Sequence, residues 1–152
     1  MLADGPGRSA PNRLDRDVLS LPGVRTVFPF QGVNDLKAGT GVSADDLVEG
    51  YREIIDRAHA AGGCVAGAAV GPFKGWSERS PEAVRREVDA FIRDGGEFDA
   101  VADFDRIPRS PYDPGRMMPA LDGGDRIHPG DRGMQAMADA VGLSAPDCDG
   151  TG

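Results

Sequence analysis

The chain has 152 residues, of which 39% are hydrophobic and 28% are charged, and its formal net charge at pH 7 is −8. This length and composition are typical of one folded globular domain with a single core. The acidic balance disfavours nucleic acid as a partner, because DNA or RNA binding needs a basic face that releases counterions. No apolar run approaches the roughly 20 residues that a membrane-spanning helix needs.

Residues 1–12 are rich in glycine, proline and polar side chains, which predicts a loop without the apolar stretch of a signal peptide. The two cysteines are Cys64, in an apolar run, and Cys148, in a Gly- and Asp-rich tail. Their placement indicates neither a disulfide framework nor a zinc site. We expect Cys64 to be a small core residue and residues 144–152 to be a disordered tail.

The first half of the chain alternates between helical and extended patterns. Apolar residues at helical spacing predict a short helix over residues 14–21, and a β-branched, aromatic run predicts a strand over residues 24–31. Pro29 is unusual in such a strand, because it lacks the N–H that a sheet ladder uses. A turn over residues 32–35 follows, and Ser43 then caps an amphipathic helix that a pair of glycines ends.

The second half continues this alternation. Residues 64–70 are small and apolar, which suits a strand that is covered on both faces. Ser80 and Pro81 begin the next helix, and residues 98–104 predict a third strand. A proline-bearing loop extends from about residue 105 to residue 124, and loops of this length in compact domains are more often functional or mobile than idle.

A last helix begins near Asp131 and is expected to bury Met134, Met137, Ala138 and Val141. Strands that alternate with helices imply right-handed crossovers, and therefore a parallel sheet with helices on both faces. Sites in such sheets lie beyond the carboxyl ends of the strands. The turn after the first predicted strand lies at such an end, and the loop after the third strand is long enough to reach the same rim.

The most chemically suggestive stretch is Asp125-Arg126-Ile127-His128-Pro129, which contains one of the chain's two histidines. A carboxylate here can hold the imidazole in the tautomer and orientation that a serine nucleophile requires. Spacing alone is a weak signal, since most Asp-x-x-His pairs are surface residues. Asn34 and Asp35 can equally be read as turn residues that form local hydrogen bonds.

Taken together, these stretches resemble the SGNH hydrolases, also called GDSL-type esterases and lipases. Gly32-Val33-Asn34-Asp35 is similar to the family's third block, Gly-x-Asn-Asp, placed after a strand. The stretch from Asp125 to Pro129 is similar to its last block, Asp-x-x-His followed by proline. The likeness extends over roughly Leu2 to Leu143. It implies a three-layer α/β/α, flavodoxin-like parallel sheet and the hydrolysis of small carboxylic esters, acyl or acetyl, through an acyl-enzyme without a cofactor or metal.

The resemblance also implies roles for single residues. His128 would be the general base that deprotonates a serine, and Asp125 would orient and stabilise the imidazolium. The side-chain amide of Asn34 would donate to the oxyanion of the tetrahedral intermediate, while Asp35 would brace the turn. Relatives are often exported, but the chain carries no segment that indicates its compartment.

The chain departs from the family's pattern at its beginning. It contains no Gly-Asp-Ser sequence, so no nucleophile is identified, and Ser43 and Ser80 are already explained as helix caps. The family's second block would lie just before the residues that match Met1 and Leu2. We therefore expect residues 13–143 to be the C-terminal part of an SGNH hydrolase-like domain that lacks its first one or two strands. A truncated gene product or a mis-set start codon is favoured over an evolved small enzyme.

Two functions from different classes follow. The first is an ester hydrolase whose site is incomplete, so that the isolated chain is inactive. The alternative is a non-catalytic remnant or interaction module, because the strand over residues 24–31 would have an exposed edge that can pair with a partner or a second copy. An unrelated flavodoxin-like binding domain is disfavoured, since no Gly-rich phosphate loop follows a predicted strand. His59 is read as a partly exposed helical residue, and Trp76 as either a cleft wall or a loop anchor.

Overall fold

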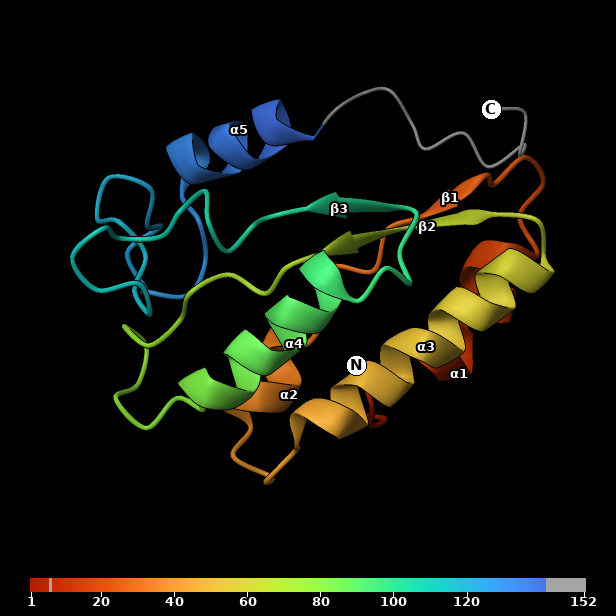
Figure 1. Cartoon of the computed structure of the whole chain (residues 1–152), viewed down its shortest axis with the longest axis horizontal. Helices are drawn as coiled ribbons and strands as arrows, with labels where there is room; N and C mark the ends of the chain where they lie inside the picture. Colours follow the sequence, from red (N-terminus) through yellow and green to blue (C-terminus); the bar gives the residue numbers. More distant parts are fainter. Residues whose placement is uncertain (6, 142–152) are drawn as a thin grey trace.

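Three parallel strands form the sheet of the computed structural model, which describes residues 1–5 and 7–141. Strand β1 (Thr26–Val27) pairs with β2 (Cys64–Ala68), and β2 pairs with β3 (Ala100–Ala102). The order is therefore β1-β2-β3, and the carboxyl ends of all three strands meet at one edge of the sheet (Figure 1). The predicted α/β class with a parallel sheet is confirmed.

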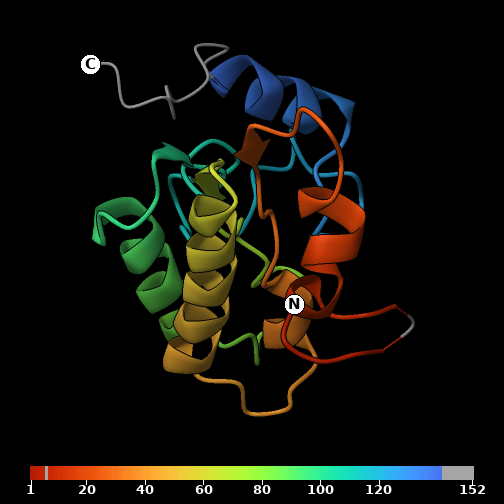
Figure 2. The same ribbon diagram turned by 90° about the vertical axis from the view of Figure 1, so that its right-hand side faces the viewer.

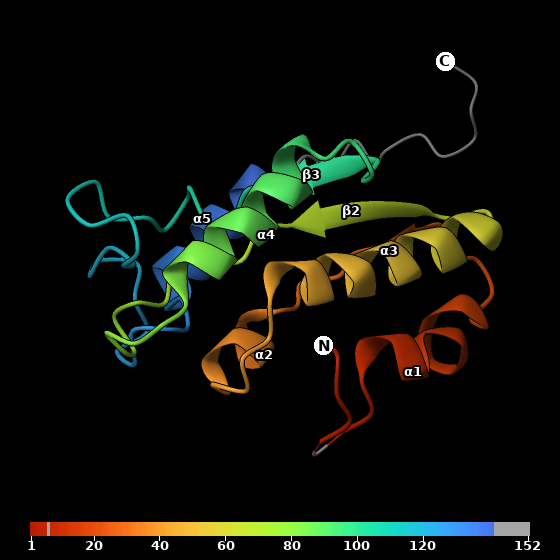
Figure 3. The ribbon, with the colours of Figure 1, turned by 60° about the horizontal axis from the view of Figure 1, so that its bottom comes forward.

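Helices cover both faces of this sheet, as a three-layer α/β/α arrangement requires. Helices α3 (Ala44–Ala60) and α4 (Glu82–Asp94) lie on one face, and α5 (Asp131–Ala140) lies on the other (Figures 1 and 3). Helix α1 (Ala10–Leu14) packs beside α3 and continues as a turn of π-helix, η1 (Asp15–Leu19) (Figure 2). Among the described residues, no helix is long and apolar enough to cross a membrane.

The chain enters α1 earlier than expected. The predicted loop over residues 1–12 ends at Ser9, whose hydroxyl accepts a hydrogen bond from the backbone N–H of Asn12 at 3.3 Å. Pro11 stands in the first turn, where its missing N–H costs nothing. Ser9 and Pro11, which lie in the predicted loop, therefore begin a helix.

Strand β1 is much shorter than the predicted strand over residues 24–31, because only its two residues pair with β2. Pro29 has no N–H to offer a neighbouring strand. The N–H of Phe30 donates to the carbonyl of Phe28 at 3.0 Å, which bends the chain locally. The predicted extent of this strand was wrong for that reason, although its position was right.

Strand β2 is the central strand, and most of its small apolar residues are buried, as predicted. Its register places Cys64 opposite Thr26, and Ala66 opposite Ala100. Cys64 is buried in the core but is disulfide-bonded, which corrects the expectation that the cysteines form no disulfide. Cys148 lies outside the described residues.

The two long helices begin in different ways. Ser43 Oγ accepts from the N–H of Asp46 at 3.2 Å, and the Asp46 carboxylate accepts from the N–H of Ser43 at 2.8 Å, which is the predicted capping box. The predicted cap at Ser80 was wrong. The N-cap of α4 is Pro81, and the buried Ser80 hydroxyl has no hydrogen-bond partner among the described residues.

Helix α4 buries two charged residues in its contact with the sheet. Arg85 and Asp89 are 1% and 0% exposed, whereas the apolar residues Val84 and Phe91 are only partly covered. The Arg85 guanidinium donates to the carbonyl of Val70 at 2.8 Å and to Asp89 and Asp105 at 2.9 and 2.6 Å. Asp89 in turn accepts from the N–H of Val70 at 2.7 Å. This buried network ties α4 to the segments that follow β2 and β3.

Helix α5 begins where it was predicted, but most of its predicted buried face is exposed. Met137 is buried in a cluster with residues at the ends of β2 and β3. Met134 is 55% exposed, and Ala138 and Val141 are exposed as well. The expected tail over residues 144–152 lies outside the described residues.

We predict that Asp89 makes the protein less stable as the pH rises. Burial raises the pKa of Asp89 to about 7, because desolvation outweighs the favourable contact with Arg85. Between about pH 4 and pH 7 the folded state then holds a proton that the unfolded chain releases, so the free energy of unfolding falls by at most about 1.4 kcal/mol per pH unit. Urea denaturation over this range should show that slope in the wild type and a flatter profile in Asp89→Asn.

The matched control is Asp94→Asn, which changes an exposed aspartate of the same helix. Its profile should follow the wild type. Equal slopes in the wild type and in Asp89→Asn would show that Asp89 is ionised across the whole range.

Candidate active site

A small apolar cavity lies at the carboxyl edge of the sheet, where the segments after all three strands meet. Its volume is about 120 Å³, and its apolar wall includes Phe30, Val70, Phe104 and Met137. His128 lines this cavity together with the short segment that follows β1. Figures 1 and 3 show the loops that follow the strands gathered at this end of the molecule. The position agrees with the rule that sites in open α/β sheets lie beyond the carboxyl ends of the strands.

The predicted dyad is formed within one turn of the loop before α5. His128 Nδ1 lies 2.5 Å from Asp125 Oδ2, and the other carboxylate oxygen accepts from the N–H groups of Ile127 and His128 at 3.0 and 2.8 Å. The hydrogen bond from His128 is the main reason that the pKa of Asp125 lies well below its usual value. The carboxylate is therefore ionised and can only accept, so Nδ1 is the donor and Nε2 is the ring nitrogen left for other contacts.

The loop around the dyad has a constrained backbone. Arg126 has a φ of 66°, and it is the only residue other than glycine with a positive φ among the described residues. The Asp122 carboxylate accepts from the N–H groups of Gly124 and Arg126 at 2.5 and 3.1 Å. A non-glycine residue in this conformation is strained by roughly 1 kcal/mol or more. Such strain persists only where surrounding contacts determine the backbone, and it is enriched at functional sites.

Asn34 lies in the first turn of a short helix, α2 (Val33–Lys37), where the sequence predicted a turn. Its side chain is exposed and makes no hydrogen bond to a described residue. The residue before it, Val33, lines the same cavity as His128. The predicted base and the backbone that carries the predicted oxyanion donor therefore border one cavity.

Gly32 makes this arrangement possible because its φ of 104° turns the chain from β1 into α2. A Cβ at this position would lie 3.3 Å from the Val70 side chain and 3.4 Å from the Tyr51 hydroxyl. That hydroxyl donates to the carbonyl of Gln31 at 3.0 Å, which anchors the turn to α3. Only glycine combines this backbone conformation with such close packing.

Asp35 connects α2 to the start of the chain. Its carboxylate accepts from the N–H of Leu2 at 2.8 Å and from the amino group of Met1 at 2.5 Å. The residue thus braces residues 1–2 against α2, instead of its own turn as expected. The Met1 and Leu2 side chains also pack against the core formed by α3 and α4.

No serine among the described residues lines the cavity that contains His128. Ser9 and Ser43 cap α1 and α3, as the hydrogen bonds of their hydroxyls show. Ser144 lies outside the described residues. The described part of the chain therefore places no serine in the cavity of the predicted base.

His59 also forms a pair with an aspartate, which spacing in the sequence did not reveal. Its Nε2 lies 2.8 Å from Asp99 Oδ2, and the same oxygen accepts from the N–H of Val65 at 2.7 Å. This pair joins the end of α3 to the amino-terminal ends of β2 and β3, at the edge of the sheet opposite to His128. Its position favours a structural role, in keeping with the expected reading of His59.

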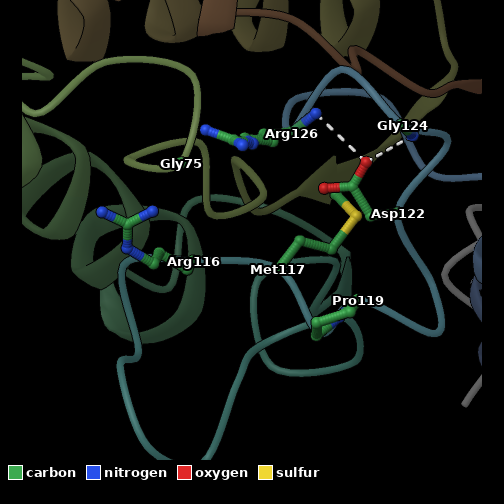
Figure 4. A pocket seen from close by; sticks show the side chains of 7 residues that line it. All are labelled: Gly75, Arg116, Met117, Pro119, Asp122, Gly124 and Arg126. Atoms are coloured by element: carbon green, nitrogen blue, oxygen red, sulfur yellow. Dashed lines mark hydrogen bonds between the residues drawn. The ribbon is translucent and has the colours of Figure 1, made fainter.

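A second, more polar cavity adjoins the first, and Met117 lines both. It has a volume of about 340 Å³, and Figure 4 shows Arg116 and Arg126 on one side of it and Asp122 on the other. Arg116 is paired with Glu78 and with an aspartate of the same loop. No spacing in the sequence indicated this cavity, although Arg126 lies inside the Asp-x-x-His stretch.

The described residues form no group of three or more His, Cys, Asp or Glu side chains arranged to hold a metal ion.

Comparison with known proteins gives one family for this chain. No curated protein matches the sequence. The profile described as the GDSL-like lipase/acylhydrolase family matches residues 4–136, which is most of the chain and includes both α2 and the Asp125–His128 pair. The chain belongs to the GDSL-like lipase/acylhydrolase family.

Proposed function

We propose that this site belongs to a hydrolase of short-chain carboxylic esters, with His128 as the general base, Asp125 as its orienting carboxylate and Asn34 as an oxyanion donor. One observation carries the proposal. His128, whose imidazole is held by Asp125 at 2.5 Å, lines an apolar cavity that is also lined by the residue before Asn34. The cavity volume of about 120 Å³ is below the range of about 300–1,000 Å³ that drug-sized ligands need, which favours a short acyl group.

The proposed reaction is acyl transfer to a hydroxyl followed by hydrolysis. Nε2 of His128 takes the proton of the hydroxyl while its oxygen attacks the ester carbonyl, and Asp125 stabilises the imidazolium. The amide of Asn34 donates to the oxyanion of the tetrahedral intermediate. The imidazolium then gives its proton to the departing alkoxide, and water repeats the sequence on the acyl-enzyme.

We predict that the 152-residue chain alone has no appreciable esterase activity and is not labelled by a fluorophosphonate. No described serine lines the cavity of His128, so no hydroxyl of the described residues is placed to be activated there. Gel fluorescence after incubation with the labelled reagent checks this expectation. Labelling that His128→Ala abolishes and His59→Ala retains would contradict it, because His59 forms a similar pair with Asp99 at the other end of the sheet.

The proposed ester hydrolysis is tested by sequencing the DNA upstream of the Met1 codon. An in-frame Gly-Asp-Ser there would supply the hydroxyl, and the extended protein should then hydrolyse p-nitrophenyl acetate. In that protein we expect Asn34→Ala to lower kcat by about 100- to 1,000-fold, the usual cost of losing one oxyanion donor. Asn12→Ala, which changes the only other asparagine of the chain, is the control. An extended protein in which both variants are fully active would refute the proposed role of Asn34.

We propose self-association through the β1 edge as a second candidate function. In the described part of the chain, β1 pairs on one side only, with β2. Its other side opens on a groove of about 140 Å³ between β1 and α1, lined in part by Val18 and Phe28. Phe28 is 41% exposed, although its ring packs edge-on against Phe104 at 5.8 Å. A strand edge that pairs with no other described strand, beside a groove that Val18 and Phe28 line in part, invites an additional strand.

We expect size-exclusion chromatography with light scattering to show a mass that rises with protein concentration. Phe28→Ser should shift the equilibrium toward the monomer, because it makes the groove polar. Tyr112→Ser is the control, since it removes an aromatic side chain that is 96% exposed in a distant loop. A monomer that melts cooperatively at every concentration would rule out this second function.

A further inference from the structure

A third cavity at the same edge of the sheet has an unusual charge for this protein. It lies between α2 and the loop that precedes α4, and its volume is about 370 Å³. Lys37 and Arg79 line it, and no acidic side chain is among its described lining residues. The whole chain carries a formal net charge of −8, so a cavity with two cations and no anion stands out.

Neither cation has an ion-pair partner among the described residues. Most arginines of this protein contact a carboxylate, as Arg116 does in the neighbouring cavity with Glu78. Lys37 instead places its ammonium group 5.8 Å from the ring centre of Trp76. The positive charge of this cavity is therefore not offset by a carboxylate of the described residues, in contrast to the cavity that Arg116 and Arg126 share with Asp122.

The remaining groups of the cavity suit an anion with an organic body. Ser77 and Ser80 bring hydroxyl groups, and the Ser80 hydroxyl is without a hydrogen-bond partner among the described residues. Trp76 is 47% exposed and provides an apolar surface. The first turn of α4, which begins beside Ser80 and Pro81, adds the positive end of a helix dipole.

The cavity is also close to the proposed oxyanion donor. Lys37 follows Asn34 by three residues on α2, and residues three apart on a helix are neighbours on its surface, with about 5–6 Å between their Cβ atoms. A ligand whose anionic group is held by Lys37 and Arg79 can therefore reach Asn34 with a chain of only a few atoms.

We propose that this cavity, named here the Lys37–Arg79 cavity, binds a carboxylate or phosphate group of the substrate, so that the preferred ester carries an acidic group. The assignment of this anion to an ester substrate rests on the proposed function, whereas anion binding by the cavity does not. The acidic group would be recognised by the two cations, and the body of the substrate would lie against Trp76.

Trp76 makes the test direct because it is the only tryptophan of the chain. Its fluorescence is measured while the 152-residue protein is titrated at low ionic strength with inorganic phosphate, with monomethyl glutarate and with the uncharged dimethyl glutarate. Saturable changes with phosphate and monomethyl glutarate are expected, with at least tenfold weaker binding of dimethyl glutarate.

Two variants locate the binding. Lys37→Met and Arg79→Met should each weaken the binding of phosphate and of monomethyl glutarate about tenfold, because each removes one charge-assisted contact. Arg8→Met is the control, since it removes an exposed arginine from the loop before α1 and should leave both affinities unchanged. Unaltered affinities in both cavity variants, or equal weakening by Arg8→Met, would overturn the proposal.

The outcomes separate this inference from the proposed function. Phosphate binding that depends on Lys37, with monomethyl glutarate bound no better than dimethyl glutarate, would show a site for free anions and overturn the substrate assignment. Preferential binding of monomethyl glutarate supports the inference even if an extended protein fails to hydrolyse p-nitrophenyl acetate. In that case ester hydrolysis is refuted, while the cavity still binds organic molecules that carry an acidic group.

Discussion

The buried guanidinium of Arg85 is the interaction on which the carboxyl edge of the sheet depends. It donates to the carbonyl of Val70, where the chain leaves β2, and to Asp105, where it leaves β3. Although burial raises the pKa of Asp105, contacts with Arg109, Arg85 and Arg93 outweigh it and keep this pKa below its usual value. Removing one charged side chain of such a network leaves its partners buried and unpaired. This destabilises the folded state by about 3–5 kcal/mol. The network thereby holds the segments that follow β2 and β3, which contribute Val70 and Phe104 to the cavity beside His128.

Local rules explain why parts of the fold could be predicted from the sequence. The capping box of Ser43 and the pair formed by Asp125 and His128 each join residues three apart. Their contacts are local in the sequence and can therefore be predicted from it. The burial of Arg85 and Asp89 could not be predicted in the same way. Four residues apart on a helix, they read as a solvated ion pair, and only the partners brought by β2 and β3 allow them to be buried.

The same distinction applies to the site. The family resemblance predicted the pair of Asp125 and His128. The structure distinguishes this pair from the similar pair of His59 and Asp99, because the two pairs lie at opposite edges of the sheet. The Lys37–Arg79 cavity joins α2 to a loop about forty residues later, so no motif spacing could reveal it. Trp76 could not be assigned from sequence for the same reason, because its role depends on the ammonium group of Lys37 that lies over its ring.

The single glycine at residue 32 has a consequence for how this architecture can evolve. With the Val70 side chain and the Tyr51 hydroxyl 3.3 and 3.4 Å from the position of a Cβ, a larger residue there is strained at its φ of 104° and must displace these neighbours or the turn into α2. The two candidate ligand-binding surfaces on α2, one beside His128 and one beside Trp76, would then shift together. Exposed residues of α2 can therefore be exchanged without moving the helix, whereas Gly32 cannot be replaced without strain at its positive φ.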